Sequence, residues 1–326
     1  MSWKSLHQTS LAEGMLIDHS ALHELDDVHD LIDWPAIERL LSDIHSRPKG
    51  EKAWPPLLMF KALLLQSWYQ LSDPGLEKQL ARDLLFRRFI GLDIAESVPD
   101  HSTIWRFRQL LASQALMEPL LQEVNAQLAR QSLYIRSGEV SIVDASVIEA
   151  RQCRPNKGAD GHPTQDAEAG WNVKAGSDGR RKSTYGFKAH LNVEEDGFIK
   201  ATNYTAGNVH DSQCFTGLLS GDEAAAYADS AYVSEAHDEW LAQHGIANRL
   251  IRRAYRNRPL TQADKQHNQQ HSSTRSVVER VFGVLKQHYG MGKARYLGLT
   301  RNRTRLELMC VAYNLKRGAS LQYRCA

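Results

Sequence analysis

The sequence predicts an α/β domain, a mixed sheet flanked by helices, that follows an all-α N-terminal domain. Apolar residues recur at helical spacing from about Trp34 to Gln131, whereas runs rich in β-branched residues begin after Ser137. From there the expected order is three strands, a helix, a strand, a helix, a strand and a helix, with one more helix at the end. We therefore expect four parts: an acidic segment (1–33), a helical domain (34–135), the α/β domain (136–318) and a tail (319–326).

The composition predicts a soluble cytoplasmic protein. Hydrophobic residues make up 42% of the 326 residues and charged residues 24%, the shares of an ordinary globular protein. No run approaches the roughly 18 apolar residues that a membrane span needs, and the N-terminus lacks an apolar signal core. The four cysteines are scattered without a CxxC pair, which argues against a disulfide framework or a structural zinc site.

Charge is distributed unevenly along the chain although the net charge is only +2. Residues 1–50 hold nine acidic residues against four basic ones, whereas residues 248–305 hold fourteen basic residues against two acidic ones, Asp264 and Glu279. A basic field of this size predicts a polyanionic partner for the C-terminal half.

The helical region carries a pattern typical of helix-turn-helix proteins. A predicted helix follows Pro99-Asp100, with Asp100 and Ser102 as capping candidates, and it opens with polar and basic residues. We expect this helix to contact DNA through Thr103, Arg106 and Arg108. The alternative is a small helical bundle whose exposed arginines have no such role.

Two aspartates stand in apolar, strand-like runs. Asp144 lies in SIVDASVI and Asp229 in AAAYADSAYVS, where a carboxylate is costly unless it is paired or binds a cation. Either one alone could be a helix cap or a buried hydrogen-bond acceptor. In the predicted strand YGFKAHLNV, Lys188 and His190 share one face, either toward the substrate or as a satisfied surface pair.

A third carboxylate lies on a predicted helix, HSSTRSVVERVFGVLKQHYG, which Ser272 or Ser273 would cap and Gly290 would end. At 100° per residue, Arg275, Glu279 and Lys286 fall within about 40° of one another, on a side distinct from the apolar stripe. The alternative is a solvated i,i+4 ion pair between Arg275 and Glu279.

Together, the three carboxylates predict a site for a hard divalent cation. Asp144, Asp229 and Glu279 would offer oxygen ligands to Mg²⁺, and two such ions about 4 Å apart can promote in-line displacement at phosphorus. Arg275 and Lys286 could then neutralise phosphates on either side of the scissile bond. The order of elements is that of a ribonuclease-H-like domain, so the residues predict metal-dependent phosphodiester chemistry on DNA or RNA.

These motifs resemble those of the DDE transposases of bacterial insertion sequences, in the large group named after the fourth and fifth elements. The C-terminal signature of that group is Tyr, two residues, Arg, three residues, Glu, six residues, Lys; Arg275, Glu279 and Lys286 match it, and Ser272 stands where tyrosine is usual. Asp229-Ser-Ala-Tyr and VDASVI resemble the other two signatures. The helical region, YGFKAH and AGNVHDS are similar to the insertion-sequence-five family.

The resemblance implies recognition of terminal inverted repeats, cleavage at the element ends and joining of the freed 3′-hydroxyl to target DNA. It implies Asp144, Asp229 and Glu279 as ligands of Mg²⁺, for which Mn²⁺ would substitute, and Arg275 and Lys286 as DNA contacts. It also implies at least a homodimer, acting on DNA in the bacterial nucleoid. Two alternatives remain: a ribonuclease-H-like nuclease that hydrolyses without joining, and a non-catalytic DNA-binding relic.

Overall fold

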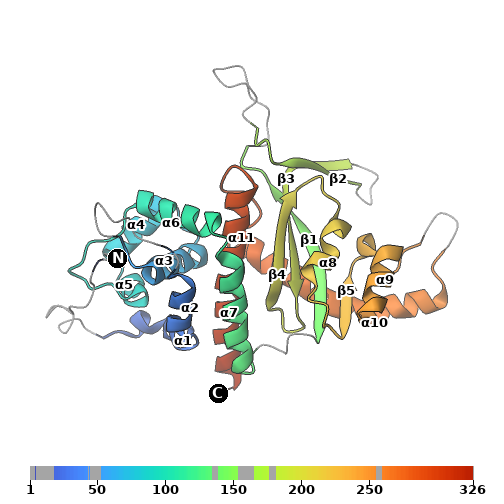
Figure 1. Cartoon of the computed structure of the whole chain (residues 1–326), viewed down its shortest axis with the longest axis horizontal. Helices are drawn as coiled ribbons and strands as arrows, with labels where there is room; N and C mark the ends of the chain where they lie inside the picture. The colour runs from blue at the N-terminus through green and yellow to red at the C-terminus, as the bar shows by residue number, and fades with distance from the viewer. Residues whose placement is uncertain are drawn as a thin grey trace. The chain divides into compact units, whose positions relative to one another are not determined.

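The computed structural model describes residues 4, 18–42, 44, 53–133, 139–152, 165–175, 181–254 and 259–325. They form two compact units (Figure 1). The helical unit combines the described residues up to Leu133 with those from Glu307 onward, and the α/β unit contains the residues between them.

The helical unit is built around α3, which buries almost its whole surface. Helix α3 begins with Pro56, whose fixed φ suits a first helical position. Side-chain caps begin two further helices: Ser72 accepts from the backbone N–H of Gly75, and Asp100 accepts from that of Thr103. The elements are η2 (Ser20–His23), α1 (Asp26–Asp30), α2 (Trp34–Leu40), α3 (Pro56–Trp68), α4 (Asp73–Arg82), α5 (Leu84–Ile90), α6 (His101–Ser113) and α7 (Met117–Arg130).

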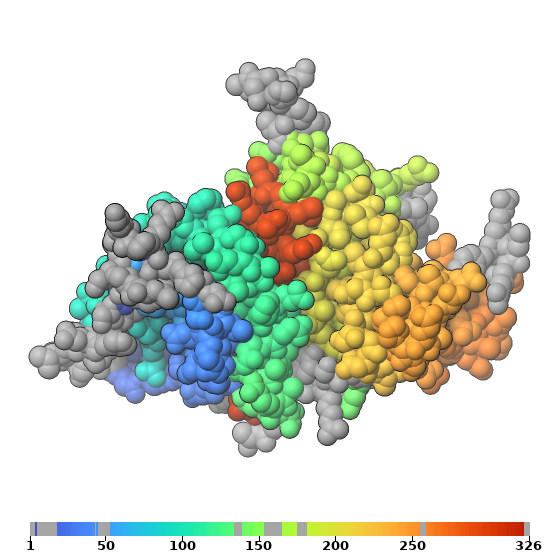
Figure 2. Space-filling view, in the orientation of Figure 1, coloured from blue at the N-terminus to red at the C-terminus, as the bar shows by residue number. Residues whose placement is uncertain are grey.

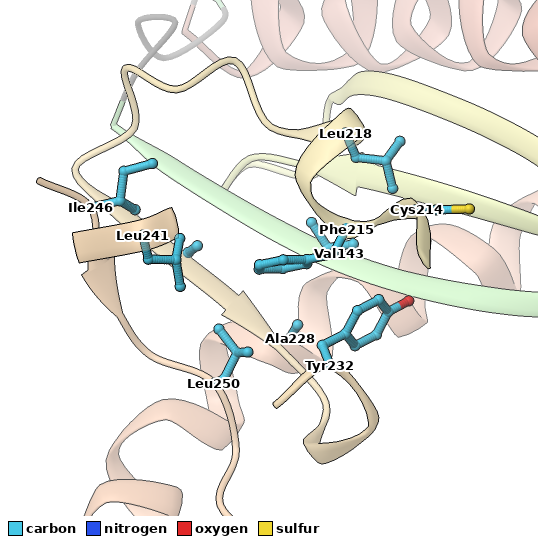
Figure 3. Packing of buried hydrophobic residues seen from close by; sticks show 10 residues of the cluster. Val143, Cys214, Phe215, Leu218, Ala228, Tyr232, Leu241, Ile246 and Leu250 are labelled. Carbon is cyan, nitrogen blue, oxygen red and sulfur yellow. The ribbon is translucent and has the colours of Figure 1, made fainter. Parts of the chain in front are cut away.

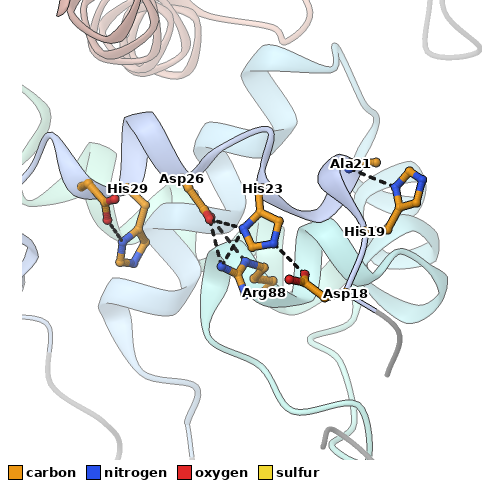
Figure 4. A network of polar contacts seen from close by, with 8 residues as sticks. Asp18, His19, Ala21, His23, Asp26, His29 and Arg88 are labelled. Carbon is orange, nitrogen blue, oxygen red and sulfur yellow. Dashed lines mark hydrogen bonds and ion pairs between the residues drawn. The ribbon is translucent and has the colours of Figure 1, made fainter. Parts of the chain in front are cut away.

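The acidic N-terminal stretch is part of this unit from Asp18 onward. Leu25, Val28 and Leu31 are buried in its core. On the surface, Arg88 of α5 forms an ion pair of 2.9 Å with Asp26, and His23 lies between Asp18 and Asp26 (Figure 4). The structure thus differs from the expected separate segment over residues 1–33.

The last helix, α11 (Leu299–Cys325), contributes its C-terminal part to the helical unit. The Trp68 indole donates a hydrogen bond to the Ala312 carbonyl at 2.9 Å, and the Asn314 side chain donates to that of Asn125 at 2.7 Å. A Cβ at Gly318 would come within 2.7 Å of Leu128. Because these contacts are made with helices of the N-terminal region, the expected boundary at residue 318 lies too far along the chain.

The α/β unit is a mixed sheet with helices, as predicted. Its elements are β1 (Val140–Glu149), β2 (Gly170–Ala175), β3 (Arg181–Val193), β4 (Ile199–Ala206), η3 (Asp211–Cys214), α8 (Phe215–Leu218), β5 (Ala225–Ala228), η4 (Ser230–Tyr232), α9 (Glu235–Gln243), β6 (Ala247–Asn248), α10 (Gln262–His288) and the start of α11. Strand β1 is central, antiparallel to β3 and parallel to β5. Strand β4 pairs with the other edge of β3, and the short β6 extends the sheet beyond β5.

Part of the region expected to be one long loop, residues 151–183, forms strands instead. Strand β2 pairs with the first half of β3. Glycines permit close approach of the backbone of β3 to β1 and of the residue after β4 to the start of β2. A Cβ at Gly186 would lie 2.0 Å from the Ile148 carbonyl oxygen, and one at Gly207 would lie 2.5 Å from that of Gly170. Residues 151, 152 and 165–169 lie outside the strands, and the rest of the expected loop, 153–164 and 176–180, lies outside the described residues.

The two faces of the sheet are covered by different helices. On one face, α8 and α9 pack over a cluster that includes Val143, Phe215 and Tyr232 (Figure 3). In Figure 2 the orange surface of α9 adjoins the yellow surface around α8. Helix α10 lies behind β1 and covers the other face with its buried stripe (Figure 1), which comprises Val277, Val278, Val281, Phe282 and Leu285.

The predicted hairpin is confirmed as β3 and β4, and the turn between them contains a buried carboxyl. Glu194 is 3% exposed; its Oε1 accepts from the backbone N–H of Phe198 at 2.9 Å, whereas its Oε2 has no hydrogen-bond partner. Burial, which penalises the charged form, raises the pKa of Glu194 to about 7.

We expect Glu194→Gln to change how stability depends on pH. Because the folded-state pKa exceeds the unfolded value of 4.5, the contribution of Glu194 is most favourable below pH 4.5 and is lost as the pH rises toward 7. The amide cannot ionise, so the variant should gain about 3 kcal/mol relative to wild type between pH 4.5 and pH 8. Urea unfolding at both pH values measures this. The matched control is Glu195→Gln, at an exposed neighbour, and an equal gain in both variants would contradict the assignment.

Candidate active site

The two strand aspartates are brought side by side by the parallel pairing of β1 and β5. Val143 is paired with Ala228, so the next residues, Asp144 and Asp229, stand at the same level on neighbouring strands. Adjacent strands are about 4.8 Å apart, which brings both carboxylates to one edge of the sheet. Asp144 lies within β1 as predicted, whereas β5 ends at Ala228 and Asp229 precedes η4.

Each aspartate uses one oxygen locally and leaves the other for the site. Oδ1 of Asp144 accepts from the backbone N–H of Ala145 at 2.8 Å, and Oδ1 of Asp229 accepts from that of Ser230 at 2.6 Å. Both Oδ2 atoms lie 3.9 Å from the same atom, Nη2 of Arg275. The local hydrogen bonds orient the two carboxylates, and the Oδ2 atoms converge.

Helix α10 supplies the third carboxylate. Its buried stripe packs on β1, β3 and β5, and the side next to this stripe, with Arg275 and Glu279, faces the aspartates. Oε1 of Glu279 lies 2.7 Å from Nη1 of Arg275. One guanidinium therefore contacts all three carboxylates, and Arg275 and Glu279 are part of a four-residue cluster rather than the solvated pair of the alternative interpretation.

The start of this helix differs from the prediction. Thr261, not Ser272 or Ser273, caps α10: its hydroxyl accepts from the Asp264 backbone N–H, and the Asp264 carboxylate accepts from that of Thr261. Ser272 lies inside the helix, where its hydroxyl donates to the Gln269 carbonyl. The helix ends as predicted, at His288, just before Gly290 with φ +65°.

Burial and charge shift two titratable groups at the site. Burial raises the pKa of Asp144 to about 6; the Ala145 N–H and Arg275 act against this, and the charges of Asp229 and Glu279 add to it. Behind Asp144, the buried hydroxyl of Tyr232 has no hydrogen-bond partner, and its pKa is raised by burial and then by Asp144. A further positive charge close to Asp144 would therefore stabilise its ionised carboxylate.

Lys286 lies two turns beyond Glu279 and extends the basic side of α10. Desolvation and the nearby positive charge of Lys174 lower its pKa, while Asp144 raises it. Lys174 belongs to β2, and sequence reasoning overlooked it because β2 was not expected. Two lysines from separate elements therefore lie close enough to interact beside the carboxylates.

The carboxylate set fits a hard divalent cation by its chemistry. Asp144, Asp229 and Glu279 offer oxygen atoms only, which Mg²⁺ and Mn²⁺ prefer over softer donors. Over the described parts of the chain, no three acidic, histidine or cysteine side chains are close enough to share one ion as they stand. The Arg275 guanidinium lies among Asp144, Asp229 and Glu279, so these carboxylates can hold a metal ion only if the guanidinium moves.

Lys188 and His190 are not brought into this cluster. His190 is paired with Ala145 and Lys188 with Val147, whereas Asp144 is paired with Leu191. Because successive strand residues point to opposite faces, both side chains lie on the face away from Asp144. The prediction that they face the substrate is therefore wrong.

Their contacts on that face are internal. Both are buried: Lys188 forms an ion pair of 2.8 Å with Asp211, and His190 Nε2 lies 2.8 Å from the Thr205 hydroxyl. Burial lowers the pKa of His190 to about 4, so its imidazole is neutral at physiological pH. The contacts of Lys188 and His190 therefore stabilise the packing against this face of the sheet.

The residues predicted on the helix-turn-helix pattern divide into two kinds. Arg106 is exposed on α6 and its guanidinium donates to the hydroxyl groups of Ser102 and Thr103. Arg108 is 2% exposed, paired with Asp73, and donates to the Gln66 side chain at 2.8 Å. Arg108 therefore cannot offer its guanidinium to DNA in this structure, whereas Thr103 and Arg106 lie at the surface.

Strand β2 also carries an exposed aromatic residue. Trp171 is 52% exposed and its ring lies 5.2 Å from that of Tyr185 on β3. A solvent-exposed tryptophan is unusual because burying its ring is favourable.

Comparison with known families agrees with this geometry. Residues 16–110 match the model described as a transposase domain (DUF772), and residues 135–315, more than half of the chain, match the transposase DDE domain. Among the described helices, none is both long and apolar enough to cross a membrane. Three carboxylates converging on a ribonuclease-H-like sheet, together with both family matches, lead to one conclusion: the chain belongs to the DDE transposases of insertion sequences, divalent-metal-dependent enzymes that cleave DNA.

Proposed function

We propose that this transposase belongs to the insertion-sequence-five family, binds the terminal inverted repeats of its element, cleaves at the element ends and joins the 3′-hydroxyl ends to target DNA. The observation that supports this most is that Asp144, Asp229 and Glu279, from three separate parts of the chain, all contact the single guanidinium of Arg275. We propose Mg²⁺ as the cation, two ions at a time, with Mn²⁺ able to replace it.

The carboxylates would hold the ions, and the basic residues would hold the DNA. Asp144, Asp229 and Glu279 are the proposed ligands, and Arg275 and Lys286 the proposed phosphate contacts. When bound, the ions supply an activated attacking oxygen and a stabilised leaving oxygen. In joining, one phosphorus–oxygen bond forms as another breaks, so strand transfer requires no nucleotide cofactor.

The helical unit is the proposed reader of the terminal repeats, with the exposed side of α6, including Thr103 and Arg106, against the duplex. This rests on the order of short helices that leads to a capped helix with exposed polar and basic residues. Bringing two element ends together requires at least a homodimer, and the basic residues between 248 and 305 support an association with the nucleoid.

Pre-cut DNA ends separate transposition from hydrolysis. We expect the protein with Mg²⁺ to join duplexes that end in the flanking terminal repeats, with free 3′-hydroxyls, to a target plasmid. Cutting of intact ends without joining of pre-cut ends would instead support a nuclease. Binding without either reaction would support a DNA-binding relic.

We expect Trp171→Ala to impair the cleavage of intact ends about tenfold, because an exposed indole on β2 can stack on an unpaired base. Binding to the duplex should not change, and Trp171→Phe, which keeps an aromatic ring, should retain most of the activity. Gel-shift and cleavage assays with intact and pre-cut ends test this. Equal cleavage by wild type and Trp171→Ala on both substrates would refute the stacking role.

A further inference from the structure

Arg275 occupies the position on which the three carboxylates converge. Its Nη2 lies 3.9 Å from Oδ2 of both Asp144 and Asp229, and its Nη1 lies 2.7 Å from Oε1 of Glu279. The side chain is only 22% exposed. A single positive charge therefore sits among three acidic side chains that belong to separate elements.

The carboxylates need a positive charge at this point in the absence of metal. Like charges held close together repel one another, and the repulsion is least screened by water at Asp144, which is 19% exposed against 45% for Asp229 and 52% for Glu279. Arg275 lies within 3.9 Å of a carboxylate oxygen of each of Asp144, Asp229 and Glu279. Within the cluster, Arg275 is the side chain that supplies the compensating charge.

The guanidinium is nevertheless incompletely bonded. Two of its three acidic contacts, at 3.9 Å, exceed hydrogen-bond length, and its buried Nε has no hydrogen-bond partner. A buried N–H without a partner costs free energy, so this arrangement depends on charge more than on hydrogen bonding. Such an arrangement can be exchanged for another cation.

We propose that Arg275 is a positioning residue that stands in for the metal: its guanidinium holds the three carboxylates together before a divalent ion binds, and it leaves the cluster when the ion enters. The inference rests on the proposed metal-binding role of the carboxylates. Ligand oxygens lie 2.0–2.1 Å from Mg²⁺, so the ion and the guanidinium cannot occupy the same position, and their charges repel. The displaced guanidinium becomes available to a DNA phosphate.

Competition of this kind has a direct consequence for metal affinity without DNA. Removing the positive charge by Arg275→Gln should tighten Mn²⁺ binding about tenfold, because the ion no longer displaces a guanidinium. In EDTA the same variant should have a lower Tm than wild type, and saturating Mn²⁺ should remove most of the difference. An arginine that served only as an i,i+4 helix pair would leave metal affinity unchanged.

The experiment is a calorimetric titration of the full chain with Mn²⁺, without DNA. Arg280→Gln is the matched control, since Arg280 is an exposed arginine on the same helix and makes the same change of charge; its affinity should stay within about twofold of wild type. Asp144→Asn identifies the heat that belongs to the carboxylate site. Equal affinities of wild type and Arg275→Gln would overturn the inference.

Two further outcomes keep this test separate from that of the proposed function. Identical titrations of wild type and Asp144→Asn would mean that the carboxylates do not bind the metal, which refutes the metal-binding role itself. If Arg275→Gln does not fold, the wild type is treated with phenylglyoxal, and modification of Arg275 is followed by mass spectrometry. We expect Mn²⁺ to increase this modification; an unchanged or lower rate would overturn the inference.

Discussion

Asp144→Asn is expected to lower metal-dependent DNA cleavage on the order of a thousandfold while leaving DNA binding intact. Asp144 is the most enclosed of the three carboxylates, at 19% exposure, and its Oδ2 is directed at the shared cation position. An amide keeps the size of the side chain and the acceptor for the Ala145 N–H, but it removes the charge that a divalent ion requires. The measurement is the initial rate of cleavage of labelled ends with Mg²⁺.

The loss should not arise from unfolding. Burial raises the pKa of Asp144 to about 6, so above that pH the folded protein carries an unfavourable buried charge that Asn lacks. Metal-free Asp144→Asn should therefore have a Tm at pH 8 no lower than that of wild type. Asp222→Asn, at an exposed position in the same unit, is the matched control and should cleave like wild type. Near-normal cleavage by Asp144→Asn would remove this residue from the site.

Arg108→Ala is expected to destabilise the helical unit by about 3 kcal/mol, because it leaves the Asp73 carboxylate and the Gln66 side chain without their buried partner. Arg106→Ala, two residues earlier on α6, should change the free energy of unfolding by less than about 0.5 kcal/mol, since Arg106 is exposed and its hydrogen bonds to Ser102 and Thr103 lie within its own helix.

In a DNA-binding assay, the variant with the smaller loss of stability should show the larger loss of affinity. We expect Arg106→Ala to weaken binding to terminal-repeat DNA, and folded Arg108→Ala at low temperature to bind like wild type. Urea unfolding and fluorescence anisotropy measure the two effects separately. A large loss of stability in Arg106→Ala, or normal stability in Arg108→Ala, would contradict this division of roles.

The catalytic candidates were visible in the sequence because a charge in an apolar run is costly. Asp144 and Asp229 interrupt runs that pack as strands, and Glu279 lies on the side of a helix away from its apolar stripe. The structure brings these three together. Their metal-binding role remains a prediction.

The sequence did not show which face of β3 lies on the same side of the sheet as Asp144. Alternation shows that Lys188 and His190 share a face, but only the register of His190 with Ala145 shows that it is the face away from Asp144. Similarly, the sequence around Arg108 predicts an exposed helical residue, whereas in the structure its guanidinium is buried against Asp73 of α4. Both errors come from long-range pairing, which sequence periodicity does not contain.

Three features were predicted wrongly: the start of α10, strand β2 and the domain boundary within α11. The capping box of Thr261 and Asp264 can be recognised in the sequence. The first turns of α10 are polar, however, so the prediction placed the start of the helix at the serines next to the apolar stripe. Strand β2 forms where glycines allow close backbone approach to its neighbours, which composition alone presents as a loop. The C-terminal part of α11 packs on residues more than 180 positions earlier in the chain, such as Asn125.

The central claim is that Asp144, Asp229 and Glu279 form one metal-dependent centre that both cuts and joins DNA. The most direct measurement is a cleavage and strand-transfer assay on DNA carrying the flanking terminal repeats, with and without Mg²⁺, for wild type and Glu279→Gln. We expect wild type to cut and join only with Mg²⁺, and Glu279→Gln to bind the same DNA without either reaction. Cutting and joining by Glu279→Gln at the wild-type rate, or by wild type in EDTA, would contradict the claim.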